Sequence, residues 1–420
     1  MNGAVVGYGK SGIAAEKLLK LKGYDDIDLY DDKAVGCLPL REFKDRYDLV
    51  VVSPGVPIDR LPELPTSYTS EIDLAYGWMP ADCKVLGVTG TNGKSTVTHL
   101  TAQILNNAGY KAIACGNIGY PYGEAVIDAE EGTIFVVELS SFQLESTCEL
   151  SIDAASVTNL TPDHLDRYDS LDSYYGAKLR ILQLIDLEGM LIAEPNTNIV
   201  NRTLNAMYPV RYVDNELKAW PKLNNNKLML GRYFVDISKF KLFGAHNIIN
   251  LTHALFLANA IAAFEGDVTH LIENLQGMPH RVELVLERDG IVWINDSKAT
   301  NVDSTLVALK SCKGSTVILL GGRDKMGDFT ALVNELNRAA SHVLLFGEAA
   351  ATISKQLKGK LKAEITIAET LHDAVNEATK VAGLGSTVIL SPGCASYDEF
   401  SGFEERGREF ARYVKEAVNA

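Results

Sequence analysis

The sequence predicts an α/β protein of three domains. The chain has 420 residues, which is more than a single hydrophobic core usually organises, so two or three domains are expected. Short apolar runs alternate with helical patterns in three successive stretches, as is typical of strands joined by crossover helices. Segments rich in proline and glycine separate these stretches. We therefore expect domains over residues 1–82, 83–277 and 278–420.

The composition excludes several classes of protein. Hydrophobic residues make up 46% and charged residues 22% of the chain, which is ordinary for a globular protein. No signal-peptide pattern opens the sequence and no apolar run approaches the ~18 residues of a membrane span, so we expect a cytoplasmic protein without a membrane partner. The formal net charge of -14 disfavours nucleic acid as a partner, since binding it requires a basic face.

The cysteines are scattered along the chain. There are six of them and no CxxC pair, which argues against a zinc site or a disulfide framework. We expect reduced cysteines in the protein core. The sequence does not determine the oligomeric state, for which we expect a monomer.

In the first stretch, apolar runs at residues 4–6, 27–30 and 49–52 predict strands. The segment 7–12 (GYGKSG) follows the first run, and Asp31 closes the second, which is the glycine pattern of a Rossmann-like nucleotide-binding domain. A glycine pattern alone is weak evidence for NAD, and tight strand-to-helix packing without a ligand is the alternative. The stretch is also too short for two full mononucleotide-binding halves.

The middle stretch carries the strongest local signal. An apolar run at 85–88 leads into residues 89–96 (TGTNGKST), and Val97, Leu100 and Ile104 continue as one face of a helix. In such a phosphate-binding loop the glycines let backbone amides approach phosphate, a lysine neutralises the β and γ oxygens, and a serine binds Mg²⁺. The segment departs from the general motif, which would have glycine at Val88. We predict a central P-loop ATPase-like domain with a parallel sheet; a glycine-rich turn with a surface lysine is the alternative.

A carboxylate follows the next apolar strand of this stretch. Glu138 comes directly after residues 133–137, and a carboxylate at the end of a strand beside a phosphate loop is placed to hold Mg²⁺. Later in the stretch, Asn224, Asn225 and Asn226 predict a turn, and the alternation over 233–243 predicts antiparallel strands.

The third stretch repeats the α/β pattern. Apolar runs at 317–320, 343–346 and 388–390 predict strands, and the last run leads into a turn at Ser391-Pro392-Gly393. We expect a C-terminal Rossmann-like domain.

Five segments together resemble the Mur ligase family of peptidoglycan synthesis. They occur in the family's order at residues 89–96 (TGTNGKST), 116–119 (GNIG), 138–144 (ELSSFQL), 159–168 (NLTPDHLDRY) and 244–247 (GAHN). Folylpolyglutamate synthases resemble the middle stretch but would not supply the motifs at either end of the chain.

The resemblance implies a set of ATP-binding and metal-binding residues. ATP is expected at Gly90, Thr91, Asn92, Gly93, Lys94, Ser95, Thr96, Asn250, Arg281 and Asp296. Two Mg²⁺ ions are expected at Ser95, Glu138, His164 and Lys178, with Lys178 carbamylated, and the catalytic residues are Lys94, His164 and Lys178. Carbamylation is physically reasonable because an ammonium would repel magnesium whereas a carbamate attracts it. Singly, these residues could equally be polar loop and helix positions.

The resemblance also implies where the other substrates bind. A UDP-linked substrate is expected at Lys10, Ser11, Asp31, Gly55 and Asn117. Residues 295–301 (NDSKATN), 321–325 (GGRDK) and 391–407 match the family member that adds D-glutamate to UDP-N-acetylmuramoyl-L-alanine. D-glutamate is then expected at Lys298, Thr300, Lys325, Ser396 and Phe403, since a dicarboxylate needs cations and hydroxyl donors. Residues 193–196 (AEPN) depart from the family pattern and are given no role.

These expectations define an ATP-dependent ligase that forms an amide bond through an acyl phosphate. A sibling ligase that adds another amino acid, a folate-tailing enzyme and a nucleotide-dependent binding module without catalysis are the alternatives.

Overall fold

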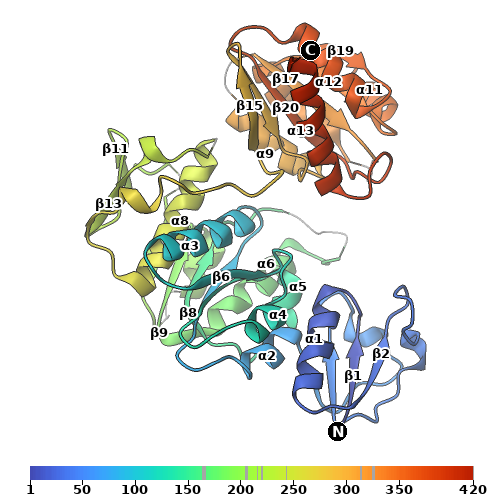
Figure 1. Cartoon of the computed structure of the whole chain (residues 1–420), viewed down its shortest axis with the longest axis vertical. Coiled ribbons are helices and arrows are strands. Elements are labelled where there is room, and N and C mark those ends of the chain that lie inside the picture. Colours follow the sequence, from blue (N-terminus) through green and yellow to red (C-terminus); the bar gives the residue numbers. More distant parts are fainter. Residues whose placement is uncertain are drawn as a thin grey trace. The chain divides into compact units, whose positions relative to one another are not determined.

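A computed structural model describes residues 1–162, 167–203, 207–214, 216–218, 221–242, 244–312, 315–323 and 327–419. The chain divides into two compact units. Figure 1 shows the course of the chain from its N-terminus to its C-terminus. Unit 1 comprises residues 1–241 and 248–275, and unit 2 comprises residues 242–247 and 276–420.

Unit 1 begins with a parallel sheet of strand order β2-β1-β3-β4. Its strands are β1 (Asn2–Val6), β2 (Asp26–Tyr30), β3 (Leu49–Val52) and β4 (Tyr68–Thr69). Its helices are α1 (Lys10–Leu21), the short 3₁₀ turns Leu40–Glu42 and Ile58–Arg60, and α2 (Glu71–Tyr76). A Cβ on Gly12 would lie 2.2 Å from the carbonyl oxygen of Gly7, so α1 packs against the end of β1 at a distance that only glycine permits.

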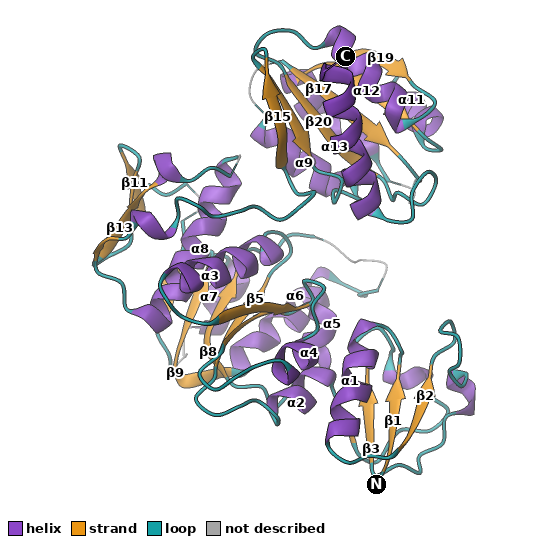
Figure 2. Cartoon of the chain, viewed as in Figure 1, coloured by secondary structure: helices purple, strands orange, loops and turns teal. Residues whose placement is uncertain are grey.

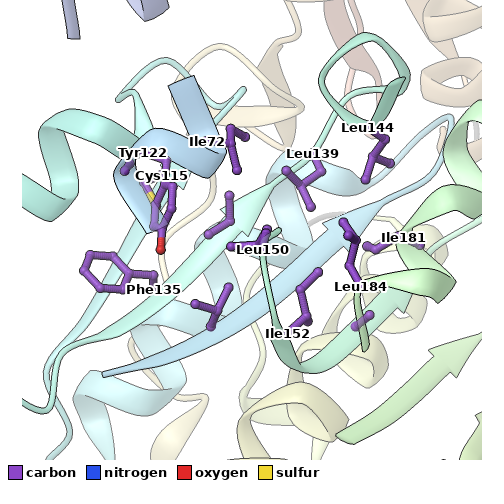
Figure 3. Close-up of a cluster of buried hydrophobic side chains, with 14 of the residues drawn as sticks. Ile72, Cys115, Tyr122, Phe135, Leu139, Leu144, Leu150, Ile152, Ile181 and Leu184 are labelled. Atoms are coloured by element: carbon purple, nitrogen blue, oxygen red, sulfur yellow. The ribbon is translucent and has the colours of Figure 1, made fainter. Parts of the chain in front are cut away.

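The larger sheet of unit 1 is parallel throughout, with strand order β10-β9-β8-β5-β7-β6. Its strands β5, β8 and β9 are labelled in Figure 2. Its strands are β5 (Lys84–Thr89), β6 (Ala112–Gly116), β7 (Ile134–Glu138), β8 (Ile152–Val157), β9 (Ile185–Ala193) and β10 (Val210–Tyr212). Its helices are α3 (Lys94–Asn107), α4 (Tyr122–Ile127), α5 (Ser141–Ser146), α6 (Leu171–Leu179), the 3₁₀ turn Arg180–Gln183 and α7 (Thr197–Thr203). β7 is buried along its whole length, as expected for a parallel strand covered on both faces. Figure 3 shows part of this core, where Phe135, Leu139 and Ile152 lie among other buried apolar side chains.

A small sheet of order β11-β12-β13-β14 follows in unit 1. Its strands are β11 (Lys222–Asn224), β12 (Lys227–Met229), β13 (Tyr233–Asp236) and β14 (Gly266–Asp267), accompanied by α8 (Ala245–Ala262) and the 3₁₀ turns Ile237–Lys239 and Thr269–Leu271. The predicted asparagine turn is confirmed, since Asn225 and Asn226 both have positive φ between paired strands. The prediction of strand over 233–243 is wrong beyond Asp236, because the Asp236 side chain accepts a hydrogen bond from the amide of Ser238 and starts a helical turn.

Unit 2 contains a sheet of order β15-β16-β20-β17-β18-β19. Its strands are β15 (Glu283–Arg288), β16 (Ile291–Asn295), β17 (Thr316–Gly321), β18 (Ala340–Phe346), β19 (Glu364–Ile367) and β20 (Thr387–Gly393). Its helices are α9 (Val302–Ser311), the 3₁₀ turn Phe329–Leu332, α10 (Val333–Ala339), α11 (Ala350–Leu357), α12 (Leu371–Val381) and α13 (Phe403–Asn419). β15 and β16 form an antiparallel hairpin, and the other pairs are parallel. The turn expected at residues 391–393 is instead the end of β20, which pairs with β17 as far as Gly393.

The predicted α/β class with parallel sheets is confirmed. The three-domain division, with boundaries at residues 82 and 277, stays a prediction. Among the described helices, none combines the length and apolar content that a bilayer span requires. The expectation of core cysteines holds for Cys83, Cys115, Cys312 and Cys394 but is wrong for Cys148, which is exposed, and for Cys37, which is half-buried.

Candidate functional site

The predicted phosphate loop lies between β5 and α3, and its two glycines are required by its shape. Gly90 and Gly93 have φ of 138° and 86°, and Gly93 is the residue before the first turn of α3. A Cβ on Gly90 would lie 2.1 Å from the hydroxyl of Thr158, and one on Gly93 would lie 2.5 Å from the side-chain oxygen of Asn250. The loop is therefore held between the end of β8 and helix α8, and Asn250 of α8 lies beside Gly93.

Hydrogen bonds to Asn159 join this loop to the segment after β8. The amide of Thr91 donates to the Asn159 carbonyl at 2.9 Å, and the amide of Asn92 donates to the Asn159 side chain at 2.9 Å. The Thr158 hydroxyl donates to the carbonyl of Asn92 at 2.6 Å. Sequence reasoning missed Asn159 as a structural residue; the available signal was a polar pair directly after a buried strand. Because these two amides are used internally, a phosphate bound here would have to use the amides in the first turn of α3.

Lys94 and Lys178 both donate to carbonyls of the phosphate loop. The Nζ of Lys94 is 2.9 Å from the oxygen of Thr91, and the Nζ of Lys178, on α6, is 2.8 Å from the oxygen of Gly90. Lys178 is only 2% exposed and its Nζ lies 4.7 Å from the ring centroid of Tyr174. The structure therefore brings Lys178 to the loop, although 88 residues separate it from Gly90.

Glu138 presents a buried oxygen that suits a cation. Its side chain is 2% exposed, and one carboxylate oxygen accepts from the Asn117 side chain at 2.8 Å. The other oxygen is buried without a hydrogen-bond partner among the described residues. Leaving a carboxylate oxygen buried and unpaired is costly, whereas a hard cation would satisfy it.

Of the other residues predicted to bind Mg²⁺, only some lie among the described residues. Ser95 is 7% exposed in the first turn of α3, whereas His164 lies outside the described residues. Within the described ranges, no group of three or more His, Cys, Asp or Glu side chains is arranged for a metal. The observation that fits Mg²⁺ is therefore the unpaired oxygen of Glu138.

Glu194 occupies the segment that was given no role. Its carboxylate accepts a hydrogen bond from the amide of Leu160 at 3.1 Å. The atypical residues 193–196 thus support the same loop that Asn159 begins.

The predicted UDP-binding residues surround the start of α1. Asp31 accepts from the amides of Tyr8, Lys33 and Ala34; burial alone would raise the pKa of Asp31, but these hydrogen bonds hold that pKa below its ordinary value. No described atom lies within 4 Å of the position of a Cβ on Gly9 or on Gly55. Both glycines thus leave open space beside the backbone, where a ligand can approach.

Lys10, a further predicted UDP-binding residue, contacts the segment after β6. The Nζ of Lys10 lies 3.5 Å from the carbonyl oxygen of Gly119, in the segment that also contains Asn117. Ser11 is half-buried in the first turn of α1. The structure thus brings Lys10 to the 116–119 segment within unit 1.

The remaining ATP residues, Arg281 and Asp296, belong to unit 2. Asp296 is 4% exposed; it accepts from the Ser391 hydroxyl at 2.8 Å and from the amide of Val282 at 3.3 Å. Burial raises the pKa of Asp296 from 3.8 to about 7, against the opposing effects of the Ser391 hydrogen bond and the Arg281 charge. The carboxyl group is thus partly protonated near neutral pH before any ligand binds.

Asp296 should make stability fall as pH rises between about pH 4 and about pH 7. In that window the folded state keeps a proton that the unfolded state has lost, so the free energy of unfolding decreases by up to about 1.4 kcal/mol per pH unit. Asp296→Asn should remove this contribution. Denaturant unfolding across the window measures it as the difference between variant and wild type, because Glu71, whose pKa burial also raises to about 7, is present in both. Parallel pH profiles of the two proteins would contradict the assignment.

Four of the residues predicted to bind D-glutamate lie after strands or at the start of α13 in unit 2: Lys298, Thr300, Ser396 and Phe403. Lys298 Nζ is 6.0 Å from the ring centroid of Phe403, and Ser396 is 2% exposed. Thr300 lines a cavity of about 320 Å³, together with Asp303, Asp328 and Gly393 among others. Lys325 lies outside the described residues. Since the two aspartates would repel a dicarboxylate, nearby cations are needed for one to bind.

A different cavity of about 480 Å³ lies in unit 1. Its lining includes Arg211, Tyr233, Phe256 and Phe264. No predicted site residue is among the described residues that line it.

Family models match most of the chain. The model described as Mur ligase middle domain matches residues 88–258, and the model described as Mur ligase, glutamate ligase domain matches residues 280–394. Among curated relatives, the UDP-N-acetylmuramoylalanine--D-glutamate ligase of Koribacter versatilis is 34% identical, over 98% of this chain and 96% of the relative. The protein of the same name from Myxococcus xanthus is 35% identical, over 98% and 97%.

Solved structures show the same fold at low identity. The MurF ligase of Thermotoga maritima in complex with ADP aligns with a TM-score of 0.61 at 14% identity, over 88% of this chain and 89% of that chain. The UDP-N-acetylmuramate-alanine ligase MurC of the same organism aligns with a TM-score of 0.59 at 16% identity, over 99% of both chains. The two family models and the near full-length relatives lead to one conclusion: the chain belongs to the Mur ligase family, and its relatives within that family are UDP-N-acetylmuramoylalanine--D-glutamate ligases.

Proposed function

We propose that the chain is an ATP-dependent ligase that joins D-glutamate to UDP-N-acetylmuramoyl-L-alanine during synthesis of a peptidoglycan precursor. The observation that carries the choice of substrates is the full-length similarity to ligases of that name, which aligns both ends of the chain and not only the nucleotide-binding part. We further propose that it acts in the cytoplasm, where ATP and nucleotide-linked sugars are available. We also propose that it is a monomer.

The first step is phosphoryl transfer. A carboxylate oxygen of the alanyl group attacks the γ-phosphorus of ATP, the bond to the bridging oxygen breaks, and ADP leaves, so that an acyl phosphate forms. Lys94 neutralises the charge that develops on the γ-phosphoryl oxygens, and the first-turn amides of α3 donate to phosphate. Asn250, Arg281 and Asp296 are further proposed nucleotide contacts, in which Arg281 would offset phosphate charge and Asp296 would accept from the ribose hydroxyls.

The second step forms the amide bond. The neutral amine of D-glutamate attacks the acyl carbon, the bond to the phosphate oxygen breaks, and inorganic phosphate leaves as the nitrogen loses a proton. Lys298, Thr300, Lys325, Ser396 and Phe403 are the proposed contacts of D-glutamate, and the cations among them offset its two carboxylates. Lys10, Ser11, Asp31, Gly55 and Asn117 are the proposed contacts of the UDP-linked substrate.

Magnesium is the proposed inorganic cofactor. The residues that would hold two ions are Ser95, Glu138, His164 and a carbamylated Lys178, and bound Mg²⁺ would supply positive charge beside the phosphates. The buried, unpaired oxygen of Glu138 supports this proposal.

Glu138→Gln should raise the Mg²⁺ concentration that gives half-maximal phosphate release by at least about tenfold, because it removes one ligand charge and keeps the shape of the side chain. The measurement is a Mg²⁺ titration at constant ATP. Glu145→Gln is the matched control, since Glu145 is a carboxylate of α5 that pairs with Arg167 at the surface. An unchanged Mg²⁺ dependence in a folded Glu138→Gln protein would argue against the metal role.

The proposed function is tested by following phosphate release with ATP, UDP-N-acetylmuramoyl-L-alanine and a panel of D- and L-amino acids. D-glutamate should give the fastest release, and Lys325→Ala should weaken D-glutamate use far more than ATP binding. A preference for another amino acid would identify a sibling ligase. Release that does not depend on any amino acid, or ATP binding without release, would favour a nucleotide-dependent binding module.

A further inference from the structure

Arg406, at the start of α13, is a charged residue that the helical pattern alone would place at the surface. Its side chain is instead 0% exposed. No carboxylate lies within ion-pair distance of it among the described residues, and Asp398 and Glu399 act on it only from farther away. Burial lowers the pKa of the Arg406 guanidinium to about 10, so the group stays protonated at neutral pH. A buried cation without a paired carboxylate is expensive unless its donors are satisfied.

Four of the guanidinium's five N–H groups donate to backbone and hydroxyl oxygens from two loops. Nε donates to the Ser297 hydroxyl at 3.0 Å and Nη2 to the Ser297 carbonyl at 2.9 Å. Nη2 also donates to the carbonyl of Cys394 at 3.1 Å, and Nη1 donates to that of Ala395 at 3.1 Å. Ser297 lies in the loop after β16, and Cys394 and Ala395 lie in the loop after β20. These two strands are neighbours in the sheet.

The same group also contacts the loop after β17 and the start of its own helix. A Cβ on Gly322 would lie 2.9 Å from Nη1 and 2.2 Å from the carbonyl oxygen of Ala395, and Gly322 has φ of 120°. The amide of Arg323 donates to that Ala395 oxygen at 2.8 Å. The Ser297 hydroxyl in turn donates a hydrogen bond to the carbonyl of Phe403 at 2.8 Å. One guanidinium thus joins the carboxyl ends of β16, β20 and β17, where α/β sheets bind their ligands.

The segments that Arg406 joins carry the proposed D-glutamate contacts. Lys298 and Thr300 follow Ser297, Ser396 follows Ala395, and Phe403 opens α13. We propose that Arg406 is a positioning residue for the amino-acid substrate: through its hydrogen bonds to the loops after β16 and β20, it sets the distance between the groups that receive the two carboxylates. This inference rests on the proposed function.

Steady-state kinetics of full-length variants tests the proposal. Arg406→Met keeps most of the side-chain volume but removes the donors, and it should raise the KM for D-glutamate by at least about tenfold. It should also reduce the preference for D-glutamate over D-aspartate, because the spacing of the two carboxylate sites is no longer fixed. Direct ATP binding should weaken much less than D-glutamate use, since the phosphate loop belongs to unit 1 and only Arg281 and Asp296 among the proposed nucleotide contacts belong to unit 2. A purely structural defect lowers the active fraction, which changes the apparent kcat but neither the KM nor the preference.

Three further variants sharpen the result. Arg406→Lys keeps the charge but cannot reach all four oxygens, so its KM should stay raised. Ser297→Ala removes only the bridging hydroxyl and should raise the KM for D-glutamate by about threefold. If Arg406→Met does not fold, the KM of Ser297→Ala tests the positioning role in its place. Arg408→Met removes a positive charge from an exposed position of the same helix and should leave the KM unchanged.

Each outcome bears on one proposal. Unchanged KM and preference in Arg406→Met, or in Ser297→Ala if Arg406→Met does not fold, would overturn the positioning role, and so would full restoration by Arg406→Lys. If wild-type protein prefers an amino acid other than D-glutamate, the proposed function fails instead, and the same variants are then measured with the preferred amino acid.

Discussion

Replacing Lys94 by alanine should reduce phosphate release by at least about 100-fold, corresponding to about 3 kcal/mol of lost transition-state stabilisation. Lys94 begins α3 and its Nζ lies against the phosphate loop, 2.9 Å from the oxygen of Thr91. As the bond to ADP breaks, negative charge is redistributed over the oxygens around the γ-phosphorus. A fixed cation at this position stabilises this transition state more than the ground state.

The fold should survive this change. Lys94 is half-buried, and its Nζ donates to a loop carbonyl at the edge of the protein interior. Replacing it by alanine therefore removes little packing. Thermal unfolding and ATP-independent binding of the UDP-linked substrate would verify that the protein is intact. Lys84→Ala is the control, because Lys84 starts β5 and pairs with Asp153 at an exposed position. Near-normal turnover of folded Lys94→Ala protein would refute the phosphate-loop assignment.

Lys178→Ala should be nearly inactive, with a loss of at least about 100-fold, and small carboxylates such as formate or acetate should partly restore it. Lys178 is buried, and its Nζ donates to the carbonyl of Gly90. Carbamylation leaves one hydrogen on this nitrogen, so a carbamate can keep the hydrogen bond while presenting a negative charge for Mg²⁺. A carboxylate diffusing into the space left by the side chain would replace that charge.

Two controls separate the carbamate from a purely structural role of Lys178. Lys94→Ala should gain nothing from added carboxylates, because its missing charge is positive. Wild-type protein should incorporate isotope-labelled bicarbonate at Lys178, and Lys178→Ala should not. Full activity of the variant without additive, or no rescue together with no label in wild type, would rule out the carbamate.

The local parts of the site were predictable from sequence because they are contiguous. A strand, a glycine loop and an amphipathic helix follow one another between residues 84 and 107, so periodicity and turn chemistry place Lys94 without knowledge of the tertiary fold. Glu138 is similarly fixed by its place at the end of an apolar strand. Lys178 is different: its contact with Gly90 spans 88 residues, and only the family resemblance pointed to it.

Other features depend on tertiary contacts that no local pattern contains. Arg406 looks like a surface residue of an amphipathic helix, but its acceptors are carbonyls as far as 109 residues away in sequence. Its burial follows from the arrangement of three strand ends, which local propensity does not specify. The same applies to Asn159, whose partners lie in a loop 67 residues earlier.

One missed element did have a local signal. Asp289 and Gly290, both with positive φ, connect β15 and β16 in a tight hairpin, and Asp-Gly between apolar alternations is a strong hairpin pattern. The expectation of uniformly α/β stretches hid this antiparallel pair. Conversely, the strand expected over 233–243 is too long. The alternation of apolar and polar residues continues past Asp236, but the Asp236 side chain accepts from the amide of Ser238 and so takes a backbone amide away from strand pairing.

The position of β20 has a consequence for how unit 2 is made. In the sheet, β20 lies between β16 and β17, yet it is the last of these strands to leave the ribosome. Until Thr387–Gly393 has been synthesised, the hairpin β15–β16 and the group β17–β18–β19 have no strand to join them, and each exposes an unpaired edge. Unit 2 therefore completes its sheet only after all its other strands have been synthesised. A premature stop shortly before β20 would remove the strand at the middle of the sheet together with α13, and would leave the strands on either side of it unjoined.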